Sequence, residues 1–291
     1  WRARFNDLPI SAEKSLKRCL YAGPDGRLHF DLSGSQVTDL SPLVGAPLSQ
    51  LDLGGIKGLT DLSPLRGMGL TRLILNGTSV ADLSPLREMR TLEILGLAGT
   101  QVFDLSPLEG LALKKLDLGV CPVSDLAPLR GAPLYDISLR ATHVTDLSPL
   151  TDMPLRNLDL HYTPVIDFKP LAGLPLEYCN LQYDRITDLS VLRGMPLREL
   201  VLWGCRDARN FDVLSEIETL EVLLLPSEYR DLPEADFKAI AALREHPRLR
   251  QLGSEVMGNM NAASTGSKSE FWRDWDTEQT FLPVLRQRGL K

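Results

Sequence analysis

Polar and aromatic side chains gather in the second half of the sequence, within and just after a series of short leucine-rich segments. These residues are Arg140, Asp159, His161, Tyr162, Tyr178, Asn180, Gln182, Tyr183 and Trp203. Tyrosine, tryptophan and arginine dominate binding hot spots, because each combines a large contact area with a polar group. The set therefore predicts noncovalent binding of a protein or peptide partner.

Patterns that would indicate covalent or metal chemistry are weak. Ser11 and Lys14 have the Ser-x-x-Lys spacing of a hydrolase nucleophile, but the companion motifs are missing and Ser11 suits a helix cap. Residues 266–269 end like a phosphate-binding loop but lack its first glycine at the required spacing. The four histidines are dispersed and form no metal-spaced pair. We therefore predict a protein that is not an enzyme, with no catalytic residue, no metal site and no cofactor.

The candidate residues owe their spacing to a repeated motif, Asp-Leu-Ser-Pro-Leu. Its intact and altered copies begin at residues 39, 61, 82, 104, 125, 146, 167, 188 and 210, in steps of 21 or 22. A fixed short period of this length is the signature of a solenoid, in which each repeat packs only against its neighbours. The motif aspartates are accordingly interpreted as structural corners.

Each repeat begins with a Leu-x-Leu segment, which predicts a short strand with one buried face. The ten segments are Phe30/Leu32, Leu51/Leu53, Leu73/Leu75, Leu95/Leu97, Leu116/Leu118, Ile137/Leu139, Leu158/Leu160, Cys179/Leu181, Leu200/Leu202 and Leu223/Leu225. Strands at one fixed offset stack as a parallel sheet, here of about 10–11 strands. The residues between and after the leucines then point outward to an open concave face, where the candidate residues collect.

The remainder of each repeat is predicted to form the convex side, opposite the strands. A small polar or thiol residue, such as Thr78, Thr100 or Cys121, precedes a buried branched residue and suits an inward turn with unpaired backbone groups. In the corner motif the aspartate accepts backbone N–H groups and the proline presets one tight 3₁₀ turn. The predicted fold class is therefore an α/β repeat solenoid, with turns or 3₁₀ segments on the convex side and helical caps at both ends.

The predicted domain organisation has five parts. They are an N-terminal helical cap at 1–27, the repeats at 28–226, a capping helix and last strand at 227–252, a linker-like segment at 253–269 and an apolar helical tail at 270–291. The caps are expected because an open solenoid end exposes a leucine layer and an unpaired strand edge.

Composition narrows the classes of function. A formal net charge of −6 argues against nucleic-acid binding, which needs a basic face. No apolar run approaches 18 residues, so no membrane-spanning segment is expected. Four cysteines are too few for a disulfide framework, and we interpret them as free thiols, which favours the cytoplasm without fixing the compartment. We expect a monomer, and the start at Trp1 suggests a fragment or a processed product.

The alternation of Leu-x-Leu strands with Asp-Leu-Ser-Pro-Leu corners resembles the short leucine-rich repeats of bacterial proteins, and the corner motif is similar to that of internalins. The chain departs from internalins by placing threonine or cysteine where they carry a ladder asparagine. The longer form Thr-x-Val-x-Asp-Leu-Ser-Pro-Leu-x-Gly-x-Pro-Leu, together with the ending at 270–276, looks like leucine-rich-repeat regions of planctomycete-like bacteria. Such regions are often joined to serine/threonine protein kinase domains, which implies a regulatory or sensor region of a larger signalling protein.

Three alternatives stay open at this point. The aromatic cluster either binds a partner or packs against the chain's own cap and the 253–269 segment. A cell-surface protein would use the same aromatics to stack on glycans or another ligand. An enzyme would need a cleft where the repeats meet the tail.

Overall fold

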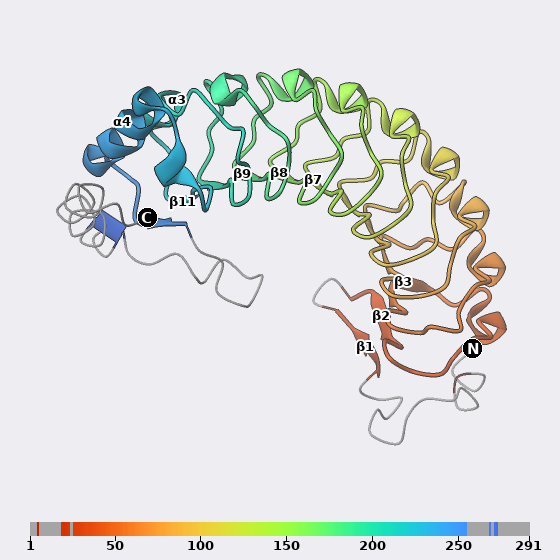
Figure 1. The fold of residues 1–291 in the computed structure, drawn as a ribbon. Coiled ribbons are helices and arrows are strands. Elements are labelled where there is room, and N and C mark those ends of the chain that lie inside the picture. The colour runs from red at the N-terminus through yellow and green to blue at the C-terminus, as the bar shows by residue number, and fades with distance from the viewer. Residues whose placement is uncertain (1–4, 6–18, 24–25, 255–267, 269–270, 273–291) are drawn as a thin grey trace. The chain divides into compact units, whose positions relative to one another are not determined.

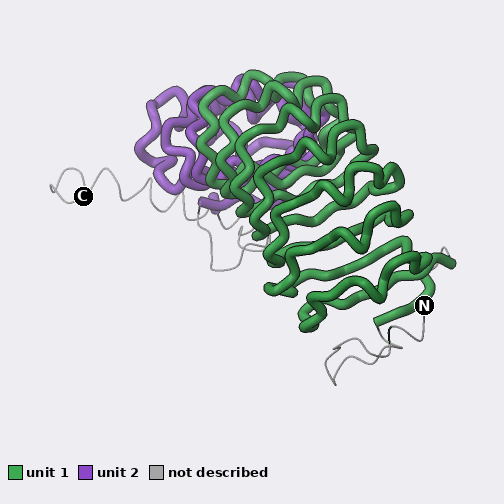
Figure 2. Tube along the Cα trace, turned by 90° about the vertical axis from the view of Figure 1, so that its right-hand side faces the viewer, with its two compact units in different colours: residues 1–174 green, residues 175–291 purple. Residues whose placement is uncertain are grey.

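The computed structural model describes Phe5, residues 19–23, residues 26–254, Lys268 and residues 271–272. The chain divides into two compact units, residues 1–174 and 175–291 (Figure 2). Both units consist of the same repeat, in which a three- to five-residue strand is followed by a turn and, in most repeats, a 3₁₀ segment.

The described part of the first unit holds eight strands in sequence order (Figure 1). They are β1 (Leu20–Ala22), β2 (Leu28–Asp31), β3 (Leu48–Asp52), β4 (Arg72–Ile74), β5 (Ile94–Gly96), β6 (Lys115–Asp117), β7 (Asp136–Ser138) and β8 (Asn157–Asp159). Strands β2 to β8 are parallel, whereas β1 pairs with β2 in the antiparallel sense. The register aligns Leu51, Leu73, Leu95 and Leu116, so each strand leucine lies beside the next and is buried.

The 3₁₀ segments of the first unit coincide with the corner motif. They are η1 (Ser41–Leu43), η2 (Ser63–Leu65), η3 (Ser84–Leu86), η4 (Ser106–Leu108), η5 (Ala127–Leu129), η6 (Ser148–Leu150) and η7 (Lys169–Leu171). In the copy at Asp146, Oδ1 accepts the Ser148 N–H at 2.8 Å and Oδ2 accepts its hydroxyl at 2.9 Å. These hydrogen bonds hold the pKa of Asp146 below its usual value, the backbone bond most of all. The predicted structural role of the corner aspartates is confirmed.

The second unit holds β9 (Tyr178–Asn180), η8 (Leu189–Leu192), β10 (Glu199–Val201), α3 (Val213–Glu216), β11 (Val222–Leu224), η9 (Tyr229–Asp231), α4 (Glu234–Ala242), η10 (Leu243–Glu245) and β12 (Gln251–Gly253). The four strands described in this unit are parallel, in sequence order. Where the corner motif decays to Asn210-Phe-Asp-Val-Leu, a short α-helix replaces the 3₁₀ segment. The predicted repeat solenoid, with its parallel strands and 3₁₀ corners, is confirmed.

The turn after each strand is closed by the small residue that the sequence places there. Thr78 and Thr142 hydroxyls donate to the carbonyls of Leu75 and Leu139 at 2.7 Å. Where the slot holds cysteine, the thiol of Cys205 donates to the Leu181 carbonyl at 2.8 Å, and burial raises its pKa to about 12. All four cysteines are buried and carry free thiols.

The two ends of the chain are described only in part. The sequence analysis does not predict β1, which lies within the predicted N-terminal helical cap at 1–27. Residues 1–4 and 6–18 of that cap lie outside the described residues. Within the second unit the predicted capping helix and last strand correspond to α4 and β12. The linker-like segment and the apolar tail fall almost wholly outside the described residues. Of the tail, Trp272 is buried and Arg244 lies over its ring, 4.8 Å from the centroid.

Candidate functional site

The turn that follows each strand has a left-handed residue at its second position. In the first four repeats this residue is Gly34, Gly55, Gly77 or Gly99, with φ between 64° and 76°. We call these the glycine turns. A turn of this kind calls for glycine, because a Cβ at positive φ clashes with the following carbonyl.

In the next four repeats the same position holds a residue with a side chain. These substituted turns are Val120, Ala141, Tyr162 and Tyr183, with φ of 61°, 52°, 61° and 61°. A left-handed conformation costs a residue with a Cβ about 1–2 kcal/mol, and β-branched valine is among the least suited to it. At the next repeat the position returns to glycine, Gly204, with φ of 77°.

Both kinds of turn have the same backbone. The Gly99 N–H donates to the Gly119 carbonyl of the next repeat at 2.7 Å, and the Val120 N–H donates in the same way to Arg140 at 2.7 Å. The turn bond from Cys121 N–H to the Leu118 carbonyl likewise matches that of the glycine turns. Neighbouring repeats thus hold the left-handed conformation in place, and the scaffold does not require the side chains that occupy it.

Three of the four substituted turns present side chains that face solvent, and Ala141 is half-buried. Tyr162, Val120 and Tyr183 are 67%, 58% and 44% exposed, and all three are among the most exposed large apolar residues described. These exposed apolar groups at strained backbone positions form the candidate contact surface.

Within the first unit, four of the predicted site residues lie on β7, β8 and the turns that follow them. Arg140 and His161 are the half-buried first residues of the turns whose second residues are Ala141 and Tyr162. The His161 and Tyr162 rings meet edge to face with centroids 6.4 Å apart. Burial, followed by the nearby Arg140 charge, lowers the pKa of His161, so this imidazole is neutral at pH 7.

Asp159 has a structural role in this group. Its Oδ1 accepts the His161 N–H at 3.0 Å, and burial raises the pKa of its carboxyl despite that bond and the Arg140 charge. Asp52 and Asp117 bond the backbone two residues on in the same way in earlier repeats. Asp159 therefore supports the turn that displays His161 and Tyr162.

The other five predicted residues belong to the second unit. Asn180 is buried, and its Oδ1 accepts the Gln182 N–H at 3.0 Å, so it too supports a turn. Tyr183 meets Trp203 edge to face at 4.7 Å between centroids. A Cβ on Gly204 would lie 2.6 Å from Tyr183 Cδ1, so the Tyr183 ring occupies the space above that glycine. This contact explains why the substituted turns end where they do.

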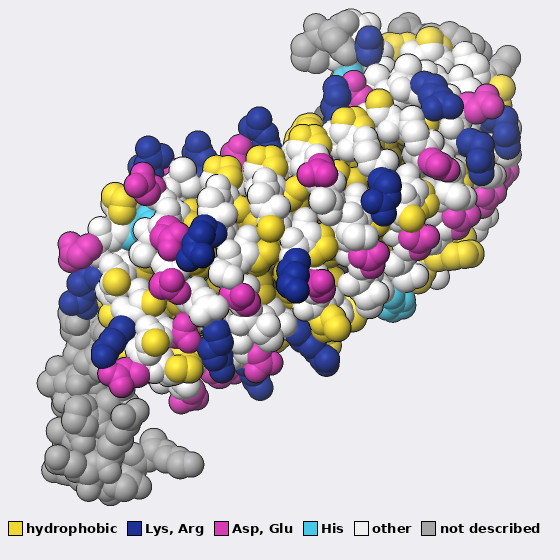
Figure 3. Space-filling model, turned by 90° about the horizontal axis from the view of Figure 1, so that it is seen from above, with side chains coloured by type: hydrophobic (Ala, Val, Ile, Leu, Met, Phe, Trp, Pro, Cys, Tyr) yellow, Lys and Arg dark blue, Asp and Glu magenta, His cyan; other side chains and the backbone are white. Residues whose placement is uncertain are grey.

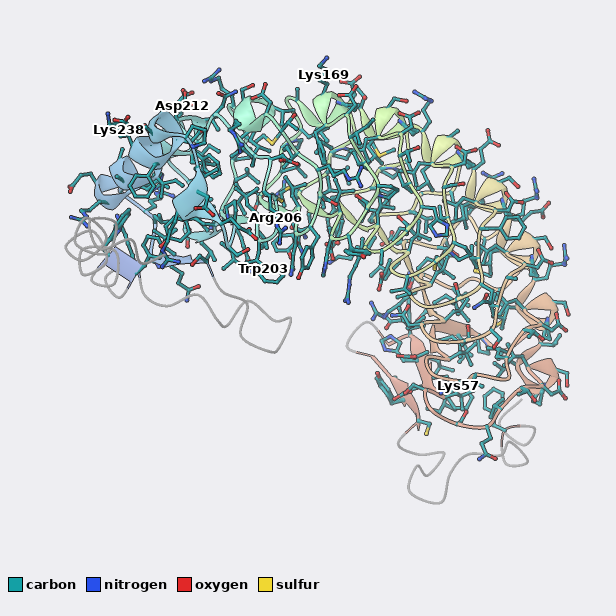
Figure 4. All side chains as sticks on the ribbon, in the orientation of Figure 1. Lys57, Lys169, Trp203, Arg206, Asp212 and Lys238 are labelled. Atoms are coloured by element: carbon teal, nitrogen blue, oxygen red, sulfur yellow. The ribbon has the colours of Figure 1, made fainter. Side chains whose placement is uncertain are left out.

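Trp203 and Arg206 lie on the sheet side of the second unit, whereas Asp212 and Lys238 point away on its helical side (Figure 4). The face seen from above in Figure 3, which carries the 3₁₀ segments, has acidic and basic side chains interspersed.

Sequence reasoning missed three residues of these surfaces. Val120 and Ala141 carry neither charge nor ring, and only the glycines at the same position of earlier repeats could have signalled them. Glu199 pairs in register with Tyr178, and burial raises the pKa of its carboxyl.

The described residues offer few groups for chemistry other than binding. Among the described residues, no cluster of three or more His, Cys, Asp or Glu side chains is placed to hold a metal ion. No helix in the described part of the chain has both the length and the apolar character needed to cross a membrane.

Comparison with known proteins agrees with this architecture. No protein-family model and no curated protein matches the chain. An internalin (InlF) from Listeria monocytogenes superposes with a TM-score of 0.64 at 24% identity, over 81% of this chain and 78% of that one. The chain has the solenoid fold of the leucine-rich-repeat proteins.

Two further leucine-rich-repeat structures are similar. Internalin C2 from Listeria monocytogenes is 30% identical with a TM-score of 0.54, over 57% of this chain and 76% of that one. The ectodomain of the Arabidopsis thaliana membrane receptor kinase GASSHO1/SCHENGEN3, solved in complex with CASPARIAN STRIP INTEGRITY FACTOR 2, has a TM-score of 0.57 at 19% identity. The match covers 78% of this leucine-rich-repeat chain but 30% of that one.

Proposed function

We propose that this leucine-rich-repeat chain is a non-enzymatic recognition module that binds a protein or peptide through its sheet face and the adjoining substituted turns. The observation that carries the proposal is the occupation of left-handed positions by exposed Val120, Tyr162 and Tyr183. The backbone ladder is the same with glycine, so these side chains cost stability without serving the fold.

The chemistry of the surface supports a protein or peptide as partner. Tyr183, Trp203 and Arg140 are hot-spot residue types, and the Tyr183–Trp203 contact restrains both rings before a partner arrives. The plant receptor ectodomain with the same fold is itself solved with a bound partner. Asp159 and Asn180, which the sequence groups with the binding residues, contribute by holding the turns.

The resemblance to kinase-linked bacterial repeat regions extends the proposal to a sensor or regulatory role within a larger signalling protein. The open reading frame around this chain tests that extension. A kinase domain encoded with the repeats supports it, and an open reading frame that encodes the repeats alone contradicts it.

The binding proposal is tested with a display library of random peptides selected against the chain. We expect selected peptides to lose at least about tenfold in affinity when Arg140, Tyr183 or Trp203 is replaced by alanine, as for hot-spot residues. Phe103→Ala is the matched control, because Phe103 is 64% exposed but lies outside the substituted turns.

Two outcomes contradict the proposal. One is that no selected peptide responds to the three substitutions. The other is that Phe103→Ala weakens binding as much as they do. A glycan array run in parallel addresses the alternative ligand class, because sugar binding lost on Trp203→Ala without peptide binding favours that class instead.

A further inference from the structure

The first unit contains a cavity remote in sequence from the proposed site. It has a volume of about 200 Å³ and lies on the sheet face of β2, β3 and β4. The residues that line it are Tyr21, His29, Phe30, Asp31, Gln50, Leu51, Asp52 and Arg72. A cavity of this size is smaller than the roughly 300–1,000 Å³ of pockets for drug-sized ligands, so it suits a very small molecule.

Strand β1 supplies one wall of this cavity. Tyr21 on β1 pairs in register with His29 on β2, and their rings meet edge to face at 5.3 Å between centroids. Tyr21 is 50% exposed and lines the cavity together with residues of β2, β3 and β4. Strand β1, added antiparallel to β2, thus encloses one side of the cavity on the sheet face.

Two carboxylates, Asp31 and Asp52, and one guanidinium, Arg72, line this cavity. Asp52 uses Oδ1 to accept the Gly54 N–H at 2.9 Å. The register pairs Gln50 with Arg72 and Asp52 with Ile74, so Asp52 and Arg72 lie diagonally on neighbouring strands. Within the described residues, neither Asp52 nor Arg72 takes part in an ion pair, although the diagonal offset is within reach of an arginine side chain.

We infer that this cavity binds a small zwitterion of the α-amino-acid class. The Arg72 guanidinium presents paired donors that match a carboxylate, and the Asp52 carboxylate accepts hydrogen bonds from an ammonium group. Tyr21 and His29 add aromatic edges and faces beside the cation, and the Gln50 amide adds a neutral donor and acceptor. A ligand with both charges satisfies both groups at once, whereas a simple amine or a simple acid leaves one of them unmatched.

Isothermal titration calorimetry with the whole chain tests this inference. The probes are glycine, L-leucine, L-glutamate and L-arginine, with butylamine and butyrate as analogues that carry only one charge. We expect at least one amino acid to bind, and to bind at least about tenfold more tightly than either single-charge analogue, as for loss of a charged hydrogen bond.

Two substitutions remove the proposed contacts and keep the fold. Arg72→Gln removes the Arg72 charge. Asp52→Asn removes the Asp52 charge, leaves Asp31 in place and keeps an oxygen for the Gly54 N–H, as Asn180 does for Gln182. Each should weaken amino-acid binding by about tenfold or more.

The chain offers a matched control for each variant. Arg66→Gln removes the same charge from an exposed residue at the end of η2. Asp117→Asn changes an aspartate that makes the same turn bond, to Gly119, but does not line the cavity. Both control variants should change the amino-acid affinity by no more than about twofold, because distant and independent sites couple only weakly.

Several results overturn the inference. They are an absence of heat with all four amino acids, equal binding of an amino acid and a single-charge analogue, and equal losses in the cavity and control variants. Peptide binding through the substituted turns is unaffected by any of these outcomes, so this test and that of the proposed function fail independently.

Discussion

The glycine turns and the substituted turns show one backbone used in two ways. Gly77 and Tyr162 occupy equivalent positions, with φ of 69° and 61°. A Cβ on Gly77 would meet only Gly55 backbone atoms, at 3.8 Å, which is ordinary contact. The early repeats thus have room for side chains but lack them, and the later repeats carry side chains that strain the backbone. The proposed function accounts for this difference, because side chains at these positions add exposed contact area at a cost in stability.

The largest effect on stability is expected from alanine substitution at one of two left-handed glycines. Gly204→Ala should lower the free energy of unfolding by about 2–3 kcal/mol, because it adds left-handed strain and displaces Tyr183 from Trp203. Gly77→Ala should cost about 1–2 kcal/mol from strain alone. Urea unfolding of both variants measures the difference, and equal costs would show that the Tyr183 ring does not depend on the space above Gly204.

Glycine substitutions at two exposed valines should change the free energy of unfolding in opposite directions. Val120→Gly relieves left-handed strain at an exposed position and should raise the free energy of unfolding by about 0.5–1 kcal/mol. Val44 is 50% exposed but has φ of −53°, so Val44→Gly should lower it by about 0.4–1 kcal/mol through the added freedom of the unfolded chain. Thermal unfolding separates the two, and destabilisation by both would mean that the Val120 turn carries no strain.

The smallest effect concerns two aspartates with opposite pKa shifts. Burial raises the folded-state pKa of Asp159 above its unfolded value of about 3.9. Its ionisation therefore costs stability, a cost absent below about pH 3.9 and complete above the raised pKa. Asp159→Asn should raise the melting temperature at pH 7, because asparagine keeps the bond to the His161 N–H, as Asn180 does to Gln182.

Asp146 provides the opposite case. Its hydrogen bonds to Ser148 lower its pKa, so it stabilises the fold above about pH 3.9 and loses this contribution as the pH falls through the lowered pKa. Asp146→Asn should lower the melting temperature at pH 7, and in both variants the difference from the parent should shrink on acidification. A shift of the same sign at pH 7 for the two variants would contradict the assignment of their roles.

Most of the scaffold could be predicted from the sequence, because every repeat uses the same order of strand, turn and corner. Leucine alternation predicted the ten strands from β2 to β11, and the corner motif predicted the 3₁₀ segments. Strand β1 could not be predicted, since Leu20–Ala22 is one isolated segment with no second copy to set its register. The cavity that β1 walls therefore escaped sequence reasoning as well.

The candidate site was predicted from residue types. This identified the aromatic residues but not the left-handed backbone at the substituted turns. Tyr162 and Tyr183 were selected as tyrosines, and their positive φ could not be read from the residue type. Val120 was missed because nothing in a lone valine signals a binding surface. Asp159 was selected as a charge, but its bond to the His161 N–H shows that it positions the turn.

The central claim is that the substituted turns exchange stability for binding. The most direct test replaces Val120, Ala141, Tyr162 and Tyr183 together by glycine, and measures thermal unfolding and affinity for a selected peptide on the same preparation. We expect the melting temperature to rise and the affinity to fall by roughly 30-fold or more, which corresponds to at least one lost hot spot. A fall in both quantities, or unchanged affinity, would contradict the account.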